Sequence, residues 1–341
     1  MATSFENSRI LVTGGTGSWG NELVKQLLEH YPTISEIRIY SRGEHKQVEM
    51  KRRFNDNPKL KFIIGDIRDK NILNYAMKGI DIVFHLAALK HVPVCEDNSW
   101  EAVLTNIHGT QNVIETAIAN KVKKVVDVST DKAVEPFNTY GVTKAAGEKL
   151  MINANYNYSH NHEYATKFIC IRGGNVIGTN GSVMPLFKEQ LTLHNEVTIT
   201  NPEMTRYLMS TKEAISLIFT AVEDSMGGEL FVMNMPGATI NTISNVMISL
   251  FGNKDSKMKI IGERPGEKMH EVLVSKNESP FTYTISDKYY VILPQIHNED
   301  LVEKYKKFPR FKQVEFSSSN TEQLGEKELT AILKKEDWLW K

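Results

Sequence analysis

The stretch SRILVTGGTGSWGNELVKQLLEHY, residues 8–31, joins a short apolar run, a glycine-rich turn and an amphipathic segment. Residues 8–15 predict a buried strand, and residues 21–31 predict a helix. The turn between them has glycines at Gly14, Gly17 and Gly20. Such a turn lets backbone N–H groups approach a pyrophosphate, which then lies at the positive N-terminus of the helix. The stretch therefore predicts a dinucleotide-binding βαβ unit.

The alternation of strand and helix patterns continues after this unit. Further strands are expected at 36–41, 61–66, 81–89 and 124–130, with helices at 45–54, 71–80 and 102–122. This order is typical of right-handed βαβ crossovers. We predict an α/β fold with a doubly wound parallel sheet of the Rossmann type.

The alternation loosens from Gly174, where segments rich in glycine, proline and isolated basic residues follow. We expect these loops to lie over the carboxyl ends of the strands, where ligands bind in such sheets. A helix is expected at 211–224, packed back on the body, and after Ser275 the chain is polar and weakly periodic. We therefore place a cofactor-binding domain with the catalytic residues at 1–174. A smaller, mainly substrate-binding region is expected at 175–341, with some segments returning to the first domain.

Charge and cysteine content exclude several classes of protein. Lys plus Arg and Asp plus Glu each number 41, so no overall field favours nucleic acid or an anionic membrane. The only cysteines, Cys95 and Cys170, form neither a metal motif nor a disulfide framework. The beginning MATSFENSRI lacks a signal-peptide pattern, and no run reaches the ~20 apolar residues that span a bilayer. We expect a cytoplasmic protein without a metal ion.

The end of the second strand indicates which dinucleotide is bound. A bare ribose 2′-hydroxyl usually meets an acidic residue there, whereas a 2′-phosphate prefers the forked guanidinium of arginine. This chain has Ser41 and Arg42 at that place, which favours NADP over NAD. After the third strand, Asp66 and Ile67 suit the edge of the adenine, although Asp66 could instead cap the end of the strand.

A polar group follows the strand at 124–130. Thr130, Asp131 and Lys132 emerge at its carboxyl end, on the side where a nicotinamide is expected. Tyr140 and Lys144 stand one helical turn apart and share a face. A nearby ammonium favours phenolate, so we expect Lys144 to lower the pKa of Tyr140 toward the range of a general base. Tyr140 could then take a proton from a sugar hydroxyl, while Lys144 also holds the nicotinamide ribose.

Taken together, these motifs resemble a known family. The glycine turn and Tyr-x-x-x-Lys mark extended short-chain dehydrogenase/reductases. Within these, residues 8–275 resemble the soluble inverting UDP-N-acetylglucosamine 4,6-dehydratases, including those that begin pseudaminic acid synthesis, with a weaker similarity at FSSSN (316–320). The matching strings are HLAALKHVPVCE (85–96), TNIHGTQNVI (105–114), STDKAVEPFNTYGVTK (129–144), RGGNVIGTNGSVMPLF (172–187), MTRYLMS (204–210) and RPGEKMHEVL (264–273).

The resemblance implies a complete reaction. Retained NADP takes a hydride from C4 of the sugar, water is eliminated across C5 and C6, and the hydride returns to C6. By position, Tyr140 deprotonates the 4-hydroxyl, Thr130 binds near O4, Asp131 protonates the leaving 6-hydroxyl and Lys132 handles the C5 proton. Lysine can do this at neutral pH only if its pKa is lowered, and Lys144 and Lys90 are candidate neighbours. Relatives also self-associate, so a dimer or hexamer is expected.

The resemblance also supplies two sets of binding residues. The cofactor set contains the glycines and the other cofactor residues given above. It also contains Thr16, Ser18, Trp19, Lys46, Ala87, Ala88 and Lys90. The set for the UDP-sugar contains Lys90, Asn175, Val183, Lys188, Met204, Arg206, Arg264 and Glu267. Arginine suits the diphosphate because its fork matches phosphate oxygens. Many relatives have Arg-Tyr-Gly-Asn where this chain has Arg172-Gly173-Gly174-Asn175, which changes the shape of the pocket.

Three alternatives remain open from the sequence. A retaining 4,6-dehydratase would carry Asp-Glu where this chain has Asp131-Lys132, and a 4-epimerase does not need that acid and base pair. A catalytically inactive NADP-binding protein has no reason to keep Tyr140 and Lys144 together with the pair.

Overall fold

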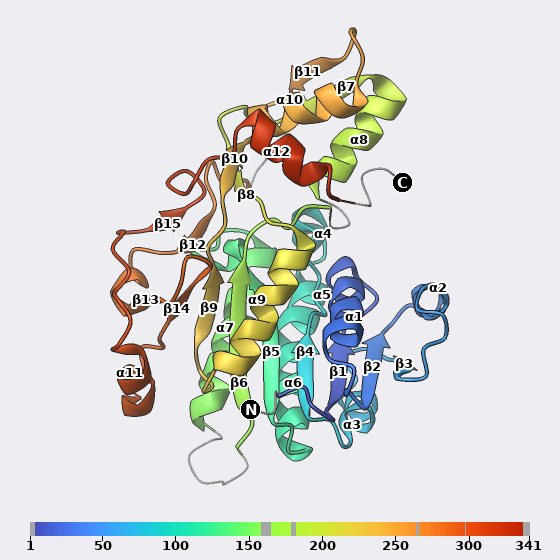
Figure 1. The fold of residues 1–341 in the computed structure, drawn as a ribbon, viewed down its shortest axis with the longest axis vertical. Coiled ribbons are helices and arrows are strands. Elements are labelled where there is room, and N and C mark those ends of the chain that lie inside the picture. The colour runs from blue at the N-terminus through green and yellow to red at the C-terminus, as the bar shows by residue number, and fades with distance from the viewer. Residues whose placement is uncertain (1–3, 158–164, 179–181, 264–265, 297, 337–341) are drawn as a thin grey trace.

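The computed structural model describes residues 4–157, 165–178, 182–263, 266–296 and 298–336 (Figure 1). Its largest element is a sheet of nine strands in the order β13-β14-β9-β6-β5-β4-β1-β2-β3. The strands are β1 (Arg9–Thr13), β2 (Glu36–Ser41), β3 (Leu60–Ile64), β4 (Ile82–His85), β5 (Lys124–Thr130), β6 (Lys167–Gly173), β9 (Leu230–Met233), β13 (Thr282–Thr284) and β14 (Tyr289–Ile292).

Seven successive strands of this sheet, β3-β2-β1-β4-β5-β6-β9, are parallel to one another. The order β3-β2-β1-β4-β5-β6 is the Rossmann order, so the predicted doubly wound parallel sheet is confirmed. The direction of winding changes between β1 and β4, where Thr13 lies beside both Tyr40 and His85. A ligand crevice is expected outside the carboxyl ends of the strands at this point.

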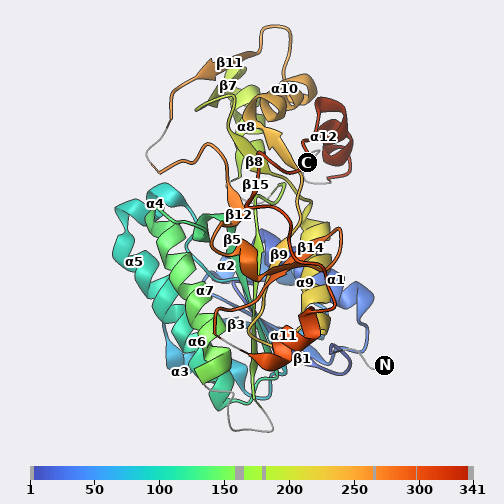
Figure 2. The ribbon, with the colours of Figure 1, turned by 90° about the vertical axis from the view of Figure 1, so that its left-hand side faces the viewer.

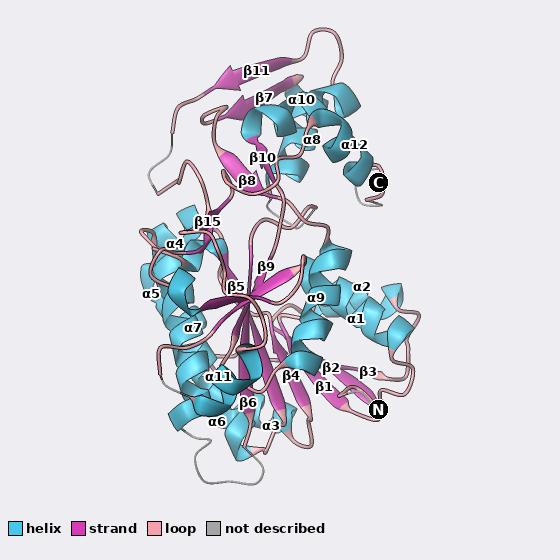
Figure 3. Ribbon diagram, turned by 60° about the vertical axis from the view of Figure 1, so that its left-hand side comes forward, coloured by secondary structure: helices cyan, strands magenta, loops and turns pink. Residues whose placement is uncertain are grey.

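Helices cover both faces of the sheet, as Figures 2 and 3 show. One face carries α1 (Ser18–His30), α2 (Glu44–Arg53) and α9 (Thr211–Asp224). The other carries α3 (Lys70–Met77), α6 (Gly109–Ala119) and α7 (Thr139–Asn157), flanked by α4 (Val92–Asp97) and α5 (Ser99–Val103). The helix expected at 211–224 is confirmed, begins with a capping box of Ser210 and Glu213, and packs on α1. One apolar core fills both interfaces between sheet and helices.

A smaller lobe lies beyond the carboxyl ends of the strands, at the top of Figure 1. It has a separate apolar core and two two-stranded sheets, one parallel and one antiparallel. Its elements are α8 (Val183–His194), β7 (Glu196–Ile199), β8 (Thr205–Tyr207), β10 (Gly237–Thr239), α10 (Ile240–Phe251), β11 (Lys257–Ile260) and α12 (Glu326–Leu333). Between lobe and body, β12 (Val272–Val274) pairs antiparallel with β15 (Phe316–Ser317).

Two features differ from the sequence prediction. The weakly periodic region after Ser275 contains the antiparallel hairpin β13–β14, which extends the sheet beyond β9, and then α11 (Glu299–Tyr305). The single helix expected at 102–122 is instead α5, a π-helical turn at Leu104–His108, and α6. In the part of the chain that the structure describes, no helix is both long and apolar enough to cross a bilayer.

Candidate active site

The glycine-rich turn joins β1 to α1 and contacts the loop after β4. Gly14 has a φ of 66°, and a Cβ there would lie 2.8 Å from the backbone of Ala87. Gly17 is the N-cap of α1, and a Cβ on Gly20 would overlap the carbonyl of Gly15. A side chain at Gly14 or Gly20 would require the backbone to move, so the glycines let a ligand approach the backbone at this helix N-terminus. The residues present therefore fit a dinucleotide pyrophosphate. Three predicted cofactor residues, Thr16, Ser18 and Trp19, are partly exposed along the same turn.

The end of β2 presents the residues predicted to select the dinucleotide. Gln47 donates hydrogen bonds to the carbonyl oxygen of Ser41 at 3.1 Å and to its Oγ at 3.0 Å, which fixes the loop. Arg42 and Lys46 are exposed beside it, at the beginning of α2. This arrangement leaves two cationic side chains accessible where a ribose 2′-phosphate is expected.

The side chains of Asp66 and Ile67 both have partners within the protein. Asp66 accepts hydrogen bonds from the backbone N–H and the guanidinium of Arg68. Burial raises the pKa of Asp66, but the hydrogen bonds and charge of Arg68 outweigh burial and lower it overall. Ile67 is buried against Gly109, whose absent side chain leaves room for it. Asp66 therefore closes the turn after the strand, and its contact with the edge of the adenine stays a prediction.

The loop after β4 carries Ala87, Ala88 and Lys90 and is held by Asn106. The Asn106 side chain accepts from the N–H of Leu89 at 2.8 Å and donates to its carbonyl at 2.9 Å. Asn106 belongs to the π-helical turn, a feature that is frequent at functional sites. Asn106 had no predicted role, although a polar residue within the apolar pattern of an expected helix was a usable signal.

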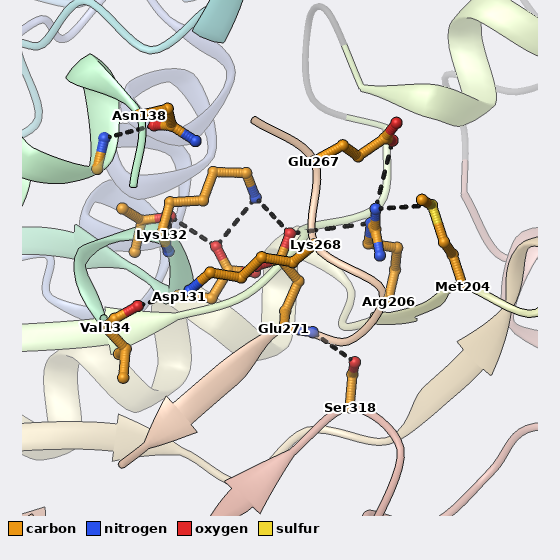
Figure 4. Close-up of polar contacts among 12 residues, drawn as sticks. Asp131, Lys132, Val134, Asn138, Met204, Arg206, Glu267, Lys268, Glu271 and Ser318 are labelled. Atoms are coloured by element: carbon orange, nitrogen blue, oxygen red, sulfur yellow. Dashed lines mark hydrogen bonds and ion pairs between the residues drawn. The ribbon is translucent and has the colours of Figure 1, made fainter. Parts of the chain in front are cut away.

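The predicted catalytic residues come together where β5 ends and α7 begins. Thr130 donates a hydrogen bond of 2.8 Å to Oδ1 of Asp131, and Nζ of Lys132 lies 3.1 Å from the same oxygen (Figure 4). Tyr140 is buried in the first turn of α7, where its hydroxyl interacts with the side chain of Thr130. A hydroxyl, a carboxylate, an ammonium and a phenol thus adjoin at the edge of the sheet where a ligand is expected.

The expected lowering of the Tyr140 pKa is wrong. Burial raises the pKa of Tyr140, and the opposing charges of Lys144 and Lys132 do not reverse this. Burial is the largest cause of the raised pKa. Lys144 itself is paired with Asp127, which is fully buried in the middle of β5. Both of its carboxylate oxygens lie 3.4 Å from Nζ of Lys144, so this ammonium is already paired. An acidic residue inside the apolar run KVVDVST was the sequence signal for this partner.

The expected lowering of the Lys132 pKa is also wrong. Burial lowers its pKa, but the charges of Asp131 and Glu271 outweigh burial and raise it overall. Glu271 Oε1 lies 3.3 Å from Lys132 Nζ, and its side chain is only 4% exposed. Glu271 had no predicted role, although it belongs to the matched string RPGEKMHEVL. Lys132 is therefore an ammonium between two carboxylates.

The segment at residues 266–271 connects the catalytic loop to the smaller lobe (Figure 4). Lys268 donates to the carbonyl of Val134 at 2.7 Å, and Asn138 donates to that of Gly266 at 3.2 Å. On the other side, Glu267 Oε1 lies 3.3 Å from Nη2 of Arg206. These contacts place a predicted phosphate-binding arginine next to the predicted acid and base pair.

The remaining predicted substrate residues lie in or near the smaller lobe. Arg206 is buried in β8 and Met204 is fully buried in the lobe's core, where its Sδ lies 3.5 Å from Nη2 of Arg206. Val183 begins α8, and Lys188 of the same helix lies over the ring of Phe251. Asn175 follows β6 and is half-buried. Arg264 lies outside the described residues.

Several buried oxygens in this region have no partner within the described residues. They are Oδ2 of Asp131, Oε2 of Glu267, Oε2 of Glu271 and Oδ1 of Asn175. Buried polar atoms are nearly always hydrogen-bonded, and the exceptions need an explanation. A polar ligand with hydroxyl groups would supply the missing donors.

Gly173 marks the departure from the Arg-Tyr-Gly-Asn pattern. A Cβ at this position would lie 3.0 Å from Sδ of Met233, which is buried in β9. A tyrosine at position 173 would therefore require the Met233 side chain to move.

The sheet order, the glycine turn and the Tyr140–Lys144 pair define an extended short-chain dehydrogenase/reductase. The chain belongs to the family described as "Polysaccharide biosynthesis protein", whose family model matches residues 10–293.

Proteins similar to this chain include two that are named as nucleotide-sugar enzymes. An inverting UDP-N-acetylglucosamine 4,6-dehydratase of Campylobacter jejuni is 43% identical, over 86% of this chain and 84% of that protein. A UDP-glucose 4-epimerase of Rickettsia bellii is 41% identical over 98% of both chains. The crystal structure of Pen from Bacillus thuringiensis has a TM-score of 0.89 and 36% identity, and the match covers 98% of this chain and all of that one.

Proposed function

We propose that this protein is an NADP-dependent UDP-N-acetylglucosamine 4,6-dehydratase that inverts C5 and acts as a homo-oligomer. Its product would be UDP-2-acetamido-2,6-dideoxy-β-L-arabino-hex-4-ulose. The observation that carries the proposal is the Asp131–Lys132 pair, hydrogen-bonded to each other beside Tyr140 at the ligand edge of the sheet. A 43% identical relative with this activity in its name supports the choice of reaction.

The cofactor site would be formed by the glycine turn, by Arg42 and Lys46, and by the loop after β4. A bound oxidised nicotinamide supplies a hydride acceptor for C4, a positive charge, and later a hydride donor for C6. Lys144, held by Asp127, would bind the nicotinamide ribose. Arg42 and Lys46 would bind the 2′-phosphate of NADP, because both are exposed cations at the end of β2.

Proton transfers would be carried by three side chains. Tyr140 would accept the proton of the 4-hydroxyl as a phenolate; the charges of Lys144 and Lys132 favour this form, whereas burial favours the phenol. The resulting 4-ketone acidifies the proton on C5. The Lys132 ammonium would pass one proton to Asp131 along their hydrogen bond. When it lies on Asp131, the Lys132 amine takes the C5 proton and Asp131 gives its proton to the leaving 6-hydroxyl.

The diphosphate would be held by the smaller lobe. Arg206 is the best-placed donor, because its guanidinium lies between Glu267 and Glu271 at the junction with the catalytic loop. Lys188 and Arg264 would add positive charge, Asn175 would hydrogen-bond the sugar, and Glu267 would accept from the uridine ribose. Val183 and Met204 would line the base.

Incubation of the protein with UDP-N-acetylglucosamine, followed by NMR, tests this assignment. The proposal expects the C6 hydroxymethyl signals to be replaced by a methyl doublet, with a keto or hydrated carbon at C4. The relative named as an epimerase matches almost the whole chain, so a 4-epimerase is the second candidate. Epimerisation would keep the C6 hydroxyl and only invert C4. If the NMR spectra of both UDP-N-acetylglucosamine and UDP-glucose stay unchanged, the protein would be a non-catalytic NADP-binding protein.

Arg42→Ala tests the choice of cofactor. The variant is expected to weaken NADP binding by ~1.5–3 kcal/mol, the range for a hydrogen bond to a charged group, and to change NAD binding little. Calorimetric titration with both dinucleotides measures this difference. Arg52→Ala, at an exposed arginine in the last turn of the same helix, is the matched control. Equal losses for NADP and NAD would remove the case for NADP.

A further inference from the structure

Glu271 lies between the predicted acid and base pair and the predicted diphosphate-binding arginine (Figure 4). Its Oε1 is 3.3 Å from Nζ of Lys132 and 3.9 Å from Nε of Arg206. Its Oε2 is buried and has no hydrogen-bond partner among the described residues. Oε1 therefore lies near both Lys132, the predicted base, and Arg206, the predicted diphosphate-binding residue. Oε2 could accept a hydrogen bond from a ligand.

The backbone of Glu271 is fixed by the C-terminal part of the chain. The N–H of Glu271 donates to Oγ of Ser318 at 2.9 Å, and the N–H of Ser318 donates to the carbonyl of Glu271 at 2.8 Å. Ser318 is fully buried, and its hydroxyl also donates to the carbonyl of Thr205, the residue before Arg206. Glu271 and Arg206 are thus held against the same serine, which sets their separation.

The ion pairs of this cluster contain one more carboxylate than cations. Among the described residues, three carboxylates, Asp131, Glu267 and Glu271, meet two cations, Lys132 and Arg206. Burying an additional charge with unsatisfied oxygens costs stability, and an apolar cluster would be at least as stable. The arrangement is therefore better explained by a task in the reaction than by stabilisation of the fold.

We propose that Glu271 is a positioning residue of the 4,6-dehydratase reaction: it holds the Lys132 ammonium beside Asp131 and at a fixed distance from Arg206. This inference rests on the proposed function and deepens it. The C5 proton acceptor is thereby aligned with the group that binds the diphosphate. Glu271 does not itself contact the reacting carbons in this assignment.

The charged groups around Lys132 determine how its pKa should change when Glu271 is replaced. Burial and Arg206 lower the pKa of Lys132, whereas Asp131, Glu271 and Tyr140 raise it. Replacing Glu271 by a neutral residue removes one of the two large raising contributions. The pKa of Lys132 should then fall, so its ammonium is lost at lower pH than in the wild type.

Glu271→Gln is the direct test, and Glu267→Gln is the matched control. Glu267 pairs with Arg206, and no ion pair joins it to Lys132 within the described residues. For Glu271→Gln we expect kcat to fall roughly 10- to 100-fold, the scale of a misplaced reacting group, with a smaller change in KM. The alkaline limb of its kcat–pH profile should move down by about one to three pH units, as expected for a lost neighbouring charge. Glu267→Gln should raise KM and leave the alkaline limb unchanged.

A second measurement does not depend on turnover. The side-chain nitrogen resonance of Lys132, identified by its absence in Lys132→Arg, can be followed by NMR as the pH is raised. It should begin to titrate at lower pH in Glu271→Gln than in the wild type or in Glu267→Gln. If the wild-type protein does not dehydrate UDP-N-acetylglucosamine, the proposed function fails, and this titration still tests the contact.

Two results would overturn the inference. One is a pH profile of Glu271→Gln that superimposes on that of the wild type, and the other is an unchanged Lys132 titration. Should Glu271→Gln fail to fold, Glu271→Asp replaces it, because aspartate keeps the charge but withdraws it by one methylene. Glu271→Asp should lower kcat and keep the alkaline limb near its wild-type position. A wild-type kcat in Glu271→Asp would show that the position of the carboxylate does not matter.

Discussion

Lys132→Arg is expected to lower kcat for dehydration by about 10²- to 10⁴-fold, the usual contribution of a placed acid or base. Arginine keeps a positive charge between Asp131 and Glu271, so neither buried carboxylate loses its partner. A guanidinium does not give up its proton in proteins and cannot accept the C5 proton. The variant therefore separates the proton-transfer role of Lys132 from its electrostatic role.

Binding and folding measurements complete this test. Titration with UDP and thermal unfolding should give values close to the wild type, because the charge pattern is kept. Lys276→Arg, at an exposed lysine outside the cluster, is the control for the substitution itself. A Lys132→Arg enzyme that keeps more than about a tenth of the wild-type kcat would contradict a proton-transfer role.

Arg172→Met is expected to destabilise the protein by about 3–5 kcal/mol, the cost of removing one partner from a buried ion pair. The Arg172 side chain is 2% exposed and lies 2.5 Å from Glu148 Oε1 and 2.9 Å from Glu278 Oε1. It also donates to the carbonyl of Leu273 at 2.9 Å. The variant would leave Glu148, which is equally buried, without a cation.

Urea unfolding of three variants measures this effect. Arg52→Met, at an exposed position, should stay within about 0.5 kcal/mol of the wild type. The double variant Arg172→Met/Glu148→Met should recover part of the loss, because it removes the unpaired carboxylate as well. An Arg172→Met protein within about 1 kcal/mol of the wild type would show that the pair does not hold α7, β6 and the segment before β13 together.

The sequence predicts most of the fold because parallel strands buried on both faces read as apolar runs. RILVT, EIRIYS and KVVDVST are all found as strands of the sheet, and the glycine turn follows the first of them. The hairpin β13–β14 escapes prediction because its strands have only three and four residues. Its place in the sheet depends on pairing with β9, which is distant in the sequence.

The candidate site is predictable where strand order determines it. Residues at the carboxyl ends of β1, β2 and β5 must share one edge of the sheet, so their common location follows from the alternating pattern. The pKa directions for Tyr140 and Lys132 do not follow from spacing. Burial is the largest cause of the raised pKa of Tyr140, and the charges of Asp131 and Glu271 outweigh burial to raise the pKa of Lys132. Burial and the approach of Glu271 to Lys132 both arise only in the tertiary fold. The spacing of Tyr140 and Lys144 in the sequence does not show that Lys144 forms an ion pair with Asp127 of β5.

Inversion at C5 is the central claim, and an early NMR spectrum of the reaction in heavy water tests it most directly. The spectrum must be recorded before the 4-ketone can epimerise in solution. The account predicts an L-arabino 4-keto-6-deoxy product carrying one solvent deuterium at C5, because the proton is returned to the face opposite the one it left. A D-xylo product as the first species formed would contradict the inverting assignment.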